Sequence, residues 1–141
     1  MSPPFPAARE NPQLVVMLRV ILFVHVGTAL DALVFLDRHT APDYWVWQDI
    51  GGYGVRGVLH LGCAVLLYDA MRAGHRRVLR VALVASIATF ASAVGAYTYW
   101  AIIRDDVPFV LAVVTASSLL LTVAAWLEPE QRAEGRWTRG A

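Results

Sequence analysis

The 141-residue chain has no lysine, a single cysteine and few charges of any kind. With Cys63 alone, an intrachain disulfide cannot form, and its apolar neighbours indicate a small packing residue. Charged residues make up 16% of the chain, whereas soluble domains carry about a quarter. The use of arginine at every basic position other than histidine is typical of a GC-rich genome. The formal net charge of +1 gives no indication of nucleic-acid binding.

Known catalytic and metal-binding motifs are also lacking. The sequence has no CxxC pair, no HExxH pair, no phosphate-binding glycine loop and no Ser-His-Asp order on soluble segments. The connections between the apolar runs are short, which leaves no soluble domain to hold a conventional active site. We therefore expect a protein that is not an enzyme, with no metal site and no cofactor.

What the chain does have is long apolar runs, with 57% hydrophobic residues and a mean hydropathy of +0.51. Four runs approach or exceed the roughly 20 residues that a helix needs to cross a bilayer, and in lipid a helix satisfies its own backbone groups. We predict an all-α fold, an integral membrane four-helix bundle of two antiparallel hairpins. The predicted spans are residues 14–36, 53–71, 78–103 and 107–127, between polar tails at 1–13 and 128–141.

The arginines predict the orientation of these spans. Basic residues gather before the first span, between the second and third, and after the fourth: Arg9, Arg72, His75, Arg76, Arg77, Arg80, Arg132, Arg136 and Arg139. The other two loops lean acidic. The positive-inside rule then places both termini and the middle loop in the cytoplasm, which predicts a multi-pass protein of the bacterial cytoplasmic membrane.

A weak internal repeat relates the first and third spans. The segment MLRVILFVHVGTALDA from Met17 resembles VLRVALVASIATFASA from Val78, and both open with Leu-Arg-Val. This similarity indicates two hairpins of the same orientation, a parallel repeat. In this alignment His25 corresponds to Ser86, and Asp31 corresponds to Ser92. The first hairpin therefore keeps ionisable groups where the second has hydroxyls, and any functional site is expected there.

Ionisable residues inside apolar spans are costly, so they turn inward or pair. Asp31 and Arg56 lie at similar depths on antiparallel neighbours, which predicts an ion pair, and His60 follows Arg56 by one helical turn on the same face. These three residues form a predicted polar cluster. At the cytoplasmic edge, Asp69 is expected to pair within a layer containing Arg19 and Arg80. Such pairs either hold helices in register or form a proton relay or a small binding pocket.

His25 lies near the middle of the first span and does not share a face with Asp31. A lone histidine there is usually a hydrogen-bonded packing residue. The alternative is haem b held axially by His25 and His60 on facing helices, although counting about 1.5 Å per residue places the two about 6 Å apart in depth.

Aromatic and small residues complete the pattern. Tyr97, Tyr99 and Trp100, together with Tyr44, Trp45, Trp47 and Tyr53, suit a belt at the outer headgroup layer, and the loop aromatics could instead form a lid over a pocket. Ala85, Thr89 and Ala93 recur at the four-residue spacing that lets helices approach closely. That face packs within the monomer or forms a dimer seam.

The layout of two hairpins, an Arg-rich middle turn and the ending TVAAWLEPEQRAEGRW resembles small uncharacterised four-span membrane proteins of high-GC, actinobacterial-type bacteria. This resemblance implies no activity. We expect a non-enzymatic accessory or binding protein whose first hairpin contacts a membrane-protein partner, a lipid or a small apolar ligand. The alternatives are an oligomeric pore or small transporter, including a holin-like homo-oligomer, and a haem-carrying electron-transfer subunit.

Overall fold

The computed structural model describes residues 11–34, 53–74, 76–104 and 109–137. Every regular element in these ranges is an α-helix: α2 (Pro12–Val34), α4 (Tyr53–Ala73), α5 (Arg76–Arg104) and α6 (Phe109–Trp137). Each helix is long and apolar enough to cross a membrane. The prediction of an all-α chain with four such helices is therefore confirmed. The predicted aromatics of the first loop (Tyr44, Trp45 and Trp47) lie outside the described residues.

The helix ends differ from the predicted span boundaries because of local capping. Asn11 caps α2, because its side-chain oxygen accepts hydrogen bonds from the backbone N–H groups of Gln13 and Leu14 at 3.1 and 3.4 Å. Pro12 follows at the first helical position, where proline is favoured. The Asn11 amide also donates to Glu128 Oε1 at 3.0 Å, which ties the start of α2 to α6. Helix α6 itself continues beyond residue 127 to Trp137.

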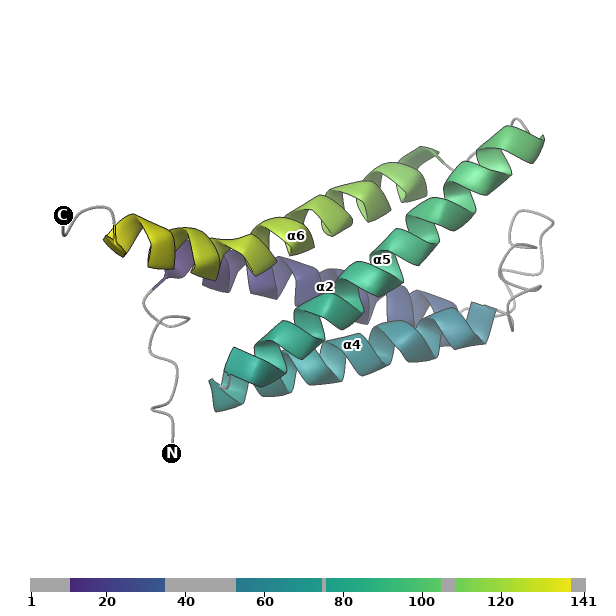
Figure 1. Cartoon of the computed structure of the whole chain (residues 1–141). Coiled ribbons are helices and arrows are strands. Elements are labelled where there is room, and N and C mark those ends of the chain that lie inside the picture. Colours follow the sequence, from purple (N-terminus) through teal and green to yellow (C-terminus); the bar gives the residue numbers. More distant parts are fainter. Residues whose placement is uncertain (1–10, 35–52, 75, 105–108, 138–141) are drawn as a thin grey trace.

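Helix α4 ends in the left-handed turn that glycine favours. Gly74 has a φ of 67°, and its N–H donates to the carbonyl of Ala70 at 3.0 Å. The chain then reverses at once into α5. In Figure 1 this connection lies at the same end of the bundle as the first turn of α2 and the last turn of α6.

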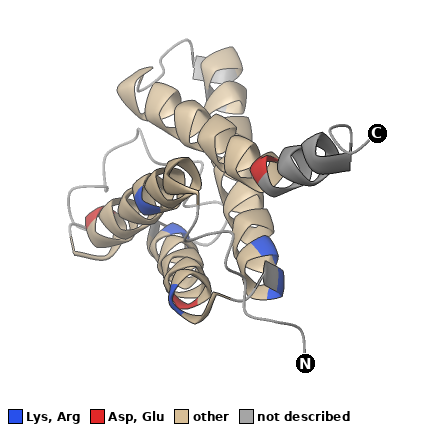
Figure 2. Ribbon diagram, turned by 90° about the vertical axis from the view of Figure 1, so that its left-hand side faces the viewer, with Lys and Arg blue, Asp and Glu red and all other residues tan. Residues whose placement is uncertain are grey.

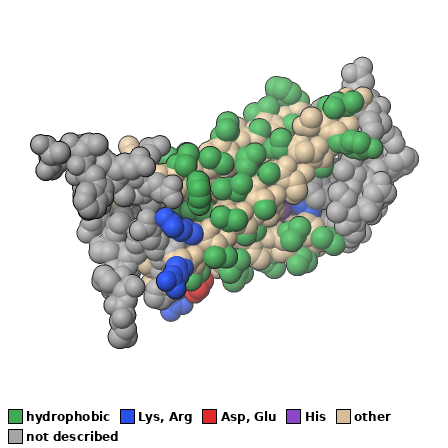
Figure 3. Space-filling view, in the orientation of Figure 1, with side chains coloured by type: hydrophobic (Ala, Val, Ile, Leu, Met, Phe, Trp, Pro, Cys, Tyr) green, Lys and Arg blue, Asp and Glu red, His purple; other side chains and the backbone are tan. Residues whose placement is uncertain are grey.

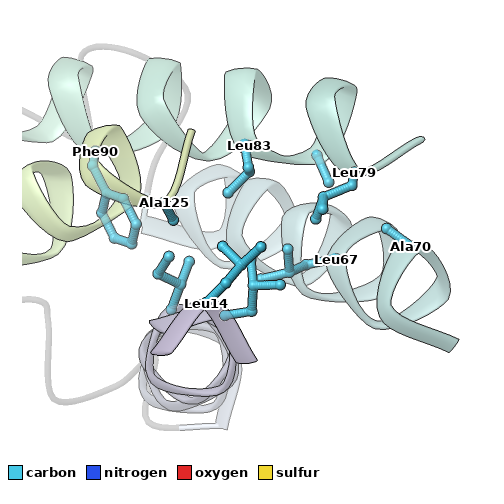
Figure 4. Close-up of a cluster of buried hydrophobic side chains, with 10 residues drawn as sticks. Leu14, Leu67, Ala70, Leu79, Leu83, Phe90 and Ala125 are labelled. Atoms are coloured by element: carbon cyan, nitrogen blue, oxygen red, sulfur yellow. The ribbon is translucent and has the colours of Figure 1, made fainter. Parts of the chain in front are cut away.

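The helices pack in a ring, with α2 against α4 and α6, and α5 against α4 and α6. Helix α5 crosses the others obliquely and diverges from α4 with distance from their connection (Figure 1). Leucines and alanines from all four helices fill the space between them (Figure 4). This main core consists of Leu14, Leu18, Ile21, Leu67, Ala70, Leu79, Ala82, Leu83, Phe90 and Ala125.

The face of the bundle that Figure 3 shows is apolar over most of its described length. Large exposed side chains occur on every helix, for example Phe23, Val58, Val84 and Leu120. Charged positions are concentrated at one end, which we call the arginine end: Arg19, Arg72, Arg77 and Arg80. Viewed from that end, basic positions occur on α2, α4 and α5 (Figure 2). The rest of the described surface exposes mainly apolar side chains, as expected for a protein surrounded by an apolar solvent.

Gly57 marks a close approach of α2 and α4. A Cβ at this position would lie 2.7 Å from Leu33 Cγ and 3.0 Å from Ala32 Cβ, whereas a Cβ at Gly62 on the same helix meets no atom within 4 Å. We expect Gly57→Ala to lower the free energy of unfolding by about 1–3 kcal/mol through overpacking. Gly62→Ala should be neutral or stabilising by up to about 1 kcal/mol, because alanine favours a helix. Denaturant titration of both variants in micelles measures the difference, and equal effects would contradict this close approach.

Candidate functional site

Five polar or aromatic side chains meet inside the bundle, and we call them the polar centre: His25, Arg56, His60, Ser86 and Tyr97. All five are buried. They come from α2, α4 and α5, so the centre draws on both predicted hairpins and not on the first alone. Buried polar groups are costly unless they find partners, so the hydrogen bonds at this centre determine what it can do.

The two histidines are in direct contact. His25 Nδ1 lies 2.8 Å from His60 Nδ1, and the ring centroids are 4.9 Å apart. On its other side, His25 Nε2 lies 2.9 Å from Ser86 Oγ. These contacts join α2, α4 and α5 in one line of hydrogen bonds, Ser86–His25–His60, which passes across the middle of the bundle.

Two neutral arrangements satisfy this line, because a neutral imidazole has one donor and one acceptor nitrogen. In the first, the Ser86 hydroxyl donates to His25 Nε2, and His25 Nδ1–H donates to His60 Nδ1. In the second, His60 Nδ1–H donates to His25 Nδ1, and His25 Nε2–H donates to Ser86 Oγ. The two arrangements have the same net charge, and all donors and acceptors along the line are exchanged.

The line ends at His60 Nε2. This nitrogen is buried and has no hydrogen-bond partner among the described residues, and the whole His60 side chain is 1% exposed. In the first arrangement it carries a proton and is a donor. In the second it is a bare acceptor. Leaving such a group without a partner costs about 1–3 kcal/mol, so an additional polar group beside this nitrogen would stabilise the polar centre.

Phe90 fixes both imidazoles. Its ring stacks on His25 with a centroid distance of 4.6 Å and an interplanar angle of 20°. It meets His60 nearly edge-on at 5.6 Å. Both distances lie within the range of favourable aromatic contacts. The α5 residues Ser86 and Phe90, one turn apart, therefore hold the histidine pair from the side opposite α2 and α4.

Arg56 lies one helical turn from His60, and its guanidinium contacts Tyr97. Arg56 Nη1 donates to the Tyr97 hydroxyl at 2.9 Å, and the guanidinium carbon lies 5.8 Å from the tyrosine ring centroid. Tyr97 is only 6% exposed. Its prediction as part of an interfacial belt is therefore wrong, because the hydroxyl faces a buried arginine and not a headgroup layer. Tyr99, two residues on, is 60% exposed.

The remaining predicted site residues lie as follows. Asp31 is partly buried on α2, while Arg19, Asp69 and Arg80 are exposed towards the arginine end. The ion pair of Asp31 with Arg56 and the pairing of Asp69 with its arginine neighbours stay predictions. The first is tested by Asp31→Asn, Arg56→Gln and the double variant, because additive losses of stability would contradict a direct pair.

Haem does not fit between the two histidines as they stand. Two nitrogens that ligate one iron from opposite sides lie about 4 Å apart, since each bond is about 2 Å long. The 2.8 Å between the Nδ1 atoms is a hydrogen-bond distance, and His25 Nε2 is already bonded to Ser86. Among the described residues, no three His, Cys, Asp or Glu side chains gather as a metal site.

A groove lies on the other side of α5, between α5 and α6. Its volume is about 290 Å³, and its lining is almost entirely apolar: Val94, Tyr97, Thr98, Ala101, Ala112 and Ala116. This volume is at the lower end for small-molecule sites and suits one segment of an acyl or isoprenoid chain. Tyr97 belongs both to this groove and to the polar centre, so an occupant of the groove would touch the side chain that holds Arg56.

Three residues of the polar centre and its support were missed from the sequence. Ser86 and Phe90 look like ordinary residues of an apolar helix, and Tyr97 resembles a belt residue. The repeat contained a signal for Ser86, because it aligns Ser86 with His25, and those two side chains are hydrogen-bonded. Cys63, predicted to be a packing residue, is buried with its Sγ 3.4 Å from Thr89 Oγ1.

Neither the protein-family models nor the curated proteins nor the solved structures contain a match to this chain. The function must therefore be inferred from the chain's own residues.

Proposed function

We propose that the chain is a four-span integral membrane protein of the bacterial cytoplasmic membrane, of the kind its layout resembles, with both termini in the cytoplasm. Support comes from the apolar outward faces of all four helices and from the gathering of arginines at one end. Apolar outward faces are stable in contact with lipid, and the positive-inside rule accounts for arginines gathered at one end of the bundle. The start of α2, the α4–α5 connection and the end of α6 share that end (Figure 1).

This orientation predicts the outcome of reporter fusions. A reporter active only in the cytoplasm should be active after residue 141 and when inserted at Gly74. A reporter active only outside should be active in the segment between α2 and α4. The expected contrast is close to all-or-none, because a polar domain does not cross the bilayer unaided. Recovery of the chain in the aqueous fraction after cell breakage would contradict the membrane assignment altogether.

We also propose the parallel repeat of the two hairpins. Buried positions on α2 recur on α5 after the same shift of 61 residues that separates His25 from Ser86. The pairs are Leu18 with Leu79, Ile21 with Ala82, His25 with Ser86, Ala29 with Phe90 and Ala32 with Ala93. A parallel repeat places equivalent residues at equal depth, which is how His25 and Ser86 meet in the middle of the bundle.

The function proposed for this protein is non-enzymatic binding of a small apolar molecule from the bilayer at the polar centre. The observation that carries the proposal is the Ser86–His25–His60 line, which ends at a buried nitrogen without a partner inside an otherwise apolar bundle. A polar group on a membrane-dissolved ligand would satisfy this nitrogen. The α5–α6 groove, which shares Tyr97 with this centre, is a separate apolar surface that could hold a ligand chain.

The burial of His60 favours binding over the alternative of an oligomeric pore. A pore formed between copies needs polar side chains on the outer faces of the single chain, yet the outward faces are dominated by side chains such as Val58 and Val84. The buried hydroxyls of Thr115, Ser118 and Thr122 on α6 donate to carbonyls of their own helix. Crosslinking in native membranes separates the two, because a holin-like pore requires assemblies of many copies.

The binding proposal is tested by ligand-dependent stability. The protein is first stripped of host lipids and then placed in nanodiscs. Adding an apolar extract of the host membrane should raise its free energy of unfolding by about 2.7 kcal/mol when the ligand concentration is one hundred times the dissociation constant. The control is the double variant His25→Leu/His60→Leu, which lacks the line but keeps the apolar faces. An equal gain in both proteins would show a general lipid effect and would count against a site at the polar centre.

A further inference from the structure

His60, on α4, contacts Phe90 of α5, so its imidazole lies between these two helices. The two helices lie close near their connection and diverge towards the opposite end of the bundle (Figure 1). In the space-filling view, histidine and basic side-chain surface is visible in the recess between them (Figure 3). Among the described residues, the histidines are His25 and His60, and the basic residue on this part of α4 is Arg56. The His60 side chain is only 1% exposed, so a ligand that enters between α4 and α5 has to displace the side chains that cover this nitrogen.

The hydrogen-bonding role of this nitrogen can be inverted without any change of charge. When His60 Nε2 holds a proton, it donates to an oxygen that accepts, such as a carbonyl. When the ligand presents a hydroxyl, the proton on Nε2 is absent, His60 Nδ1–H donates to His25, and His25 Nε2–H donates to Ser86. Ser86 accommodates both states, because a hydroxyl both donates and accepts. The site therefore suits a ligand whose oxygen changes between acceptor and donor.

We propose that the polar centre binds a membrane-soluble quinone and its quinol, with one ring oxygen hydrogen-bonded to His60 Nε2. This inference rests on the proposed function and specifies its ligand. A quinone offers a neutral carbonyl acceptor, and its quinol offers a neutral hydroxyl donor at the same atom. One tautomeric arrangement of Ser86, His25 and His60 donates to the quinone carbonyl, and the other accepts from the quinol hydroxyl.

The neutrality of both states distinguishes this class from a fatty acid. A carboxylic acid changes its hydrogen-bonding role by gaining or losing charge, whereas the two tautomeric arrangements of Ser86, His25 and His60 exchange donors and acceptors at constant charge. The buried Arg56 guanidinium would attract a carboxylate, which makes a fatty acid the competing ligand in the test. Quinones also carry long apolar tails, and such a tail suits the exposed apolar side chains of α4 and α5. No redox step is assigned to the protein, which binds the ligand in either state.

The first test uses a matched pair of variants in nanodiscs, with a short-tailed benzoquinone, its quinol and a fatty acid as probes. His60→Asn keeps an amide near the position of Nδ1, where it still reaches His25, but has no group at the position of Nε2. His60→Gln extends an amide to the position of Nε2. We expect His60→Asn to weaken quinone and quinol binding about tenfold and His60→Gln to retain most of it, with weak fatty-acid binding throughout.

The second test needs no variant. Imidazole ¹⁵N resonances of the wild-type protein report which ring nitrogen carries the proton. With quinone, His60 should carry it on Nε2 and His25 on Nδ1. With quinol, His60 should carry it on Nδ1 and His25 on Nε2. A purely structural pair would keep one tautomer in both cases, so a concerted exchange in the two rings is the signature of this site.

The outcomes separate this proposal from the broader one. Three results would overturn the quinone site. They are equal quinone affinity in the wild type and in His60→Asn, histidine tautomers that stay the same with every probe, and a trapped water as the only partner of Nε2. Preferred binding of the fatty acid would overturn it as well. If the apolar membrane extract still stabilises the wild type above the double leucine variant, the proposed binding function stands. If neither extract nor quinone has an effect that depends on the polar centre, both proposals fall.

Discussion

Replacing His25 by leucine is expected to lower the free energy of unfolding by about 2–4 kcal/mol, which is a large effect for a substitution that keeps the interior apolar. The loss leaves His60 with no partner on either nitrogen, and an unpartnered buried group costs about 1–3 kcal/mol. The stacking contact with Phe90 adds about 0.5–1.5 kcal/mol. Ser86 contributes less, because its hydroxyl can turn to a carbonyl of its own helix, as Thr122 does. Denaturant titration in micelles measures the change.

The double variant decides the cause of this loss. His25→Leu/His60→Leu removes both imidazoles, so no buried nitrogen is left without a partner. Replacing both members of a hydrogen-bonded pair by apolar groups is often nearly neutral, so the double variant should recover most of the stability lost in His25→Leu. Val26→Leu, next in the chain on an outward-facing position, is the control for added bulk. Additive losses from the two histidine substitutions would contradict the 2.8 Å contact between them.

The four helices were predictable because bilayer-length apolar runs leave little choice of structure. The requirement that backbone groups bond internally selects helices, and the runs coincide in position with α2, α4, α5 and α6. The ends of α2 were less predictable, since they depend on Asn11 as a cap and on a carboxylate of α6 that is distant in the sequence. The Asn-Pro pair was nonetheless a local signal for a helix start.

The meeting of His25 with His60 was not predictable from depth alone. The span boundaries 14–36 and 53–71 placed the two histidines about 6 Å apart along the bundle. Helix α2 starts at Pro12, two residues before the predicted start. Each residue changes the depth by about 1.5 Å, so a two-residue change of a span boundary moves a counted depth by about 3 Å. The imidazole side chains bridge the remaining offset, since their Nδ1 atoms lie 2.8 Å apart.

Tyr97 was misassigned because a sequence gives the height of an aromatic residue along a helix but not the direction in which it faces. Tyr97 and Tyr99 are at similar heights, and only the packing of α5 against α4 decides that Tyr97 turns inward to Arg56. The set of residues that share one face of α5 could be recognised from the sequence. Ser86, Phe90, Ala93 and Tyr97 recur at three- and four-residue spacing, which places them on one side of a helix. Without a neighbouring helix to compare, that side could not be identified as the buried one.

Replacing Phe90 by alanine is the second substitution with a large expected effect. Phe90 is almost fully buried and touches both imidazoles. Where lipid surrounds the bundle, the transfer of apolar surface contributes little, because the acyl chains are as apolar as the core. The cavity remains, and about 100 Å³ of lost ring at about 24 cal/mol per Å³ corresponds to about 2 kcal/mol. Loss of the aromatic contacts raises the expected cost to about 3 kcal/mol.

The matched control for this loss is Phe23→Ala on α2, where the same atoms are removed from a side chain that is 78% exposed. In micelles this variant should lose less than about 0.5 kcal/mol, because no cavity forms and detergent replaces the ring. Phe90→Ala should also free the imidazoles to turn, so the wild-type tautomer pattern of His25 and His60 should blur in ¹⁵N spectra. Phe90 supports the histidine pair only if both changes occur together. A cavity-sized loss of stability with unchanged histidine resonances would mean that Phe90 fills space, and that contacts with Ser86 and with each other are sufficient to hold the two rings.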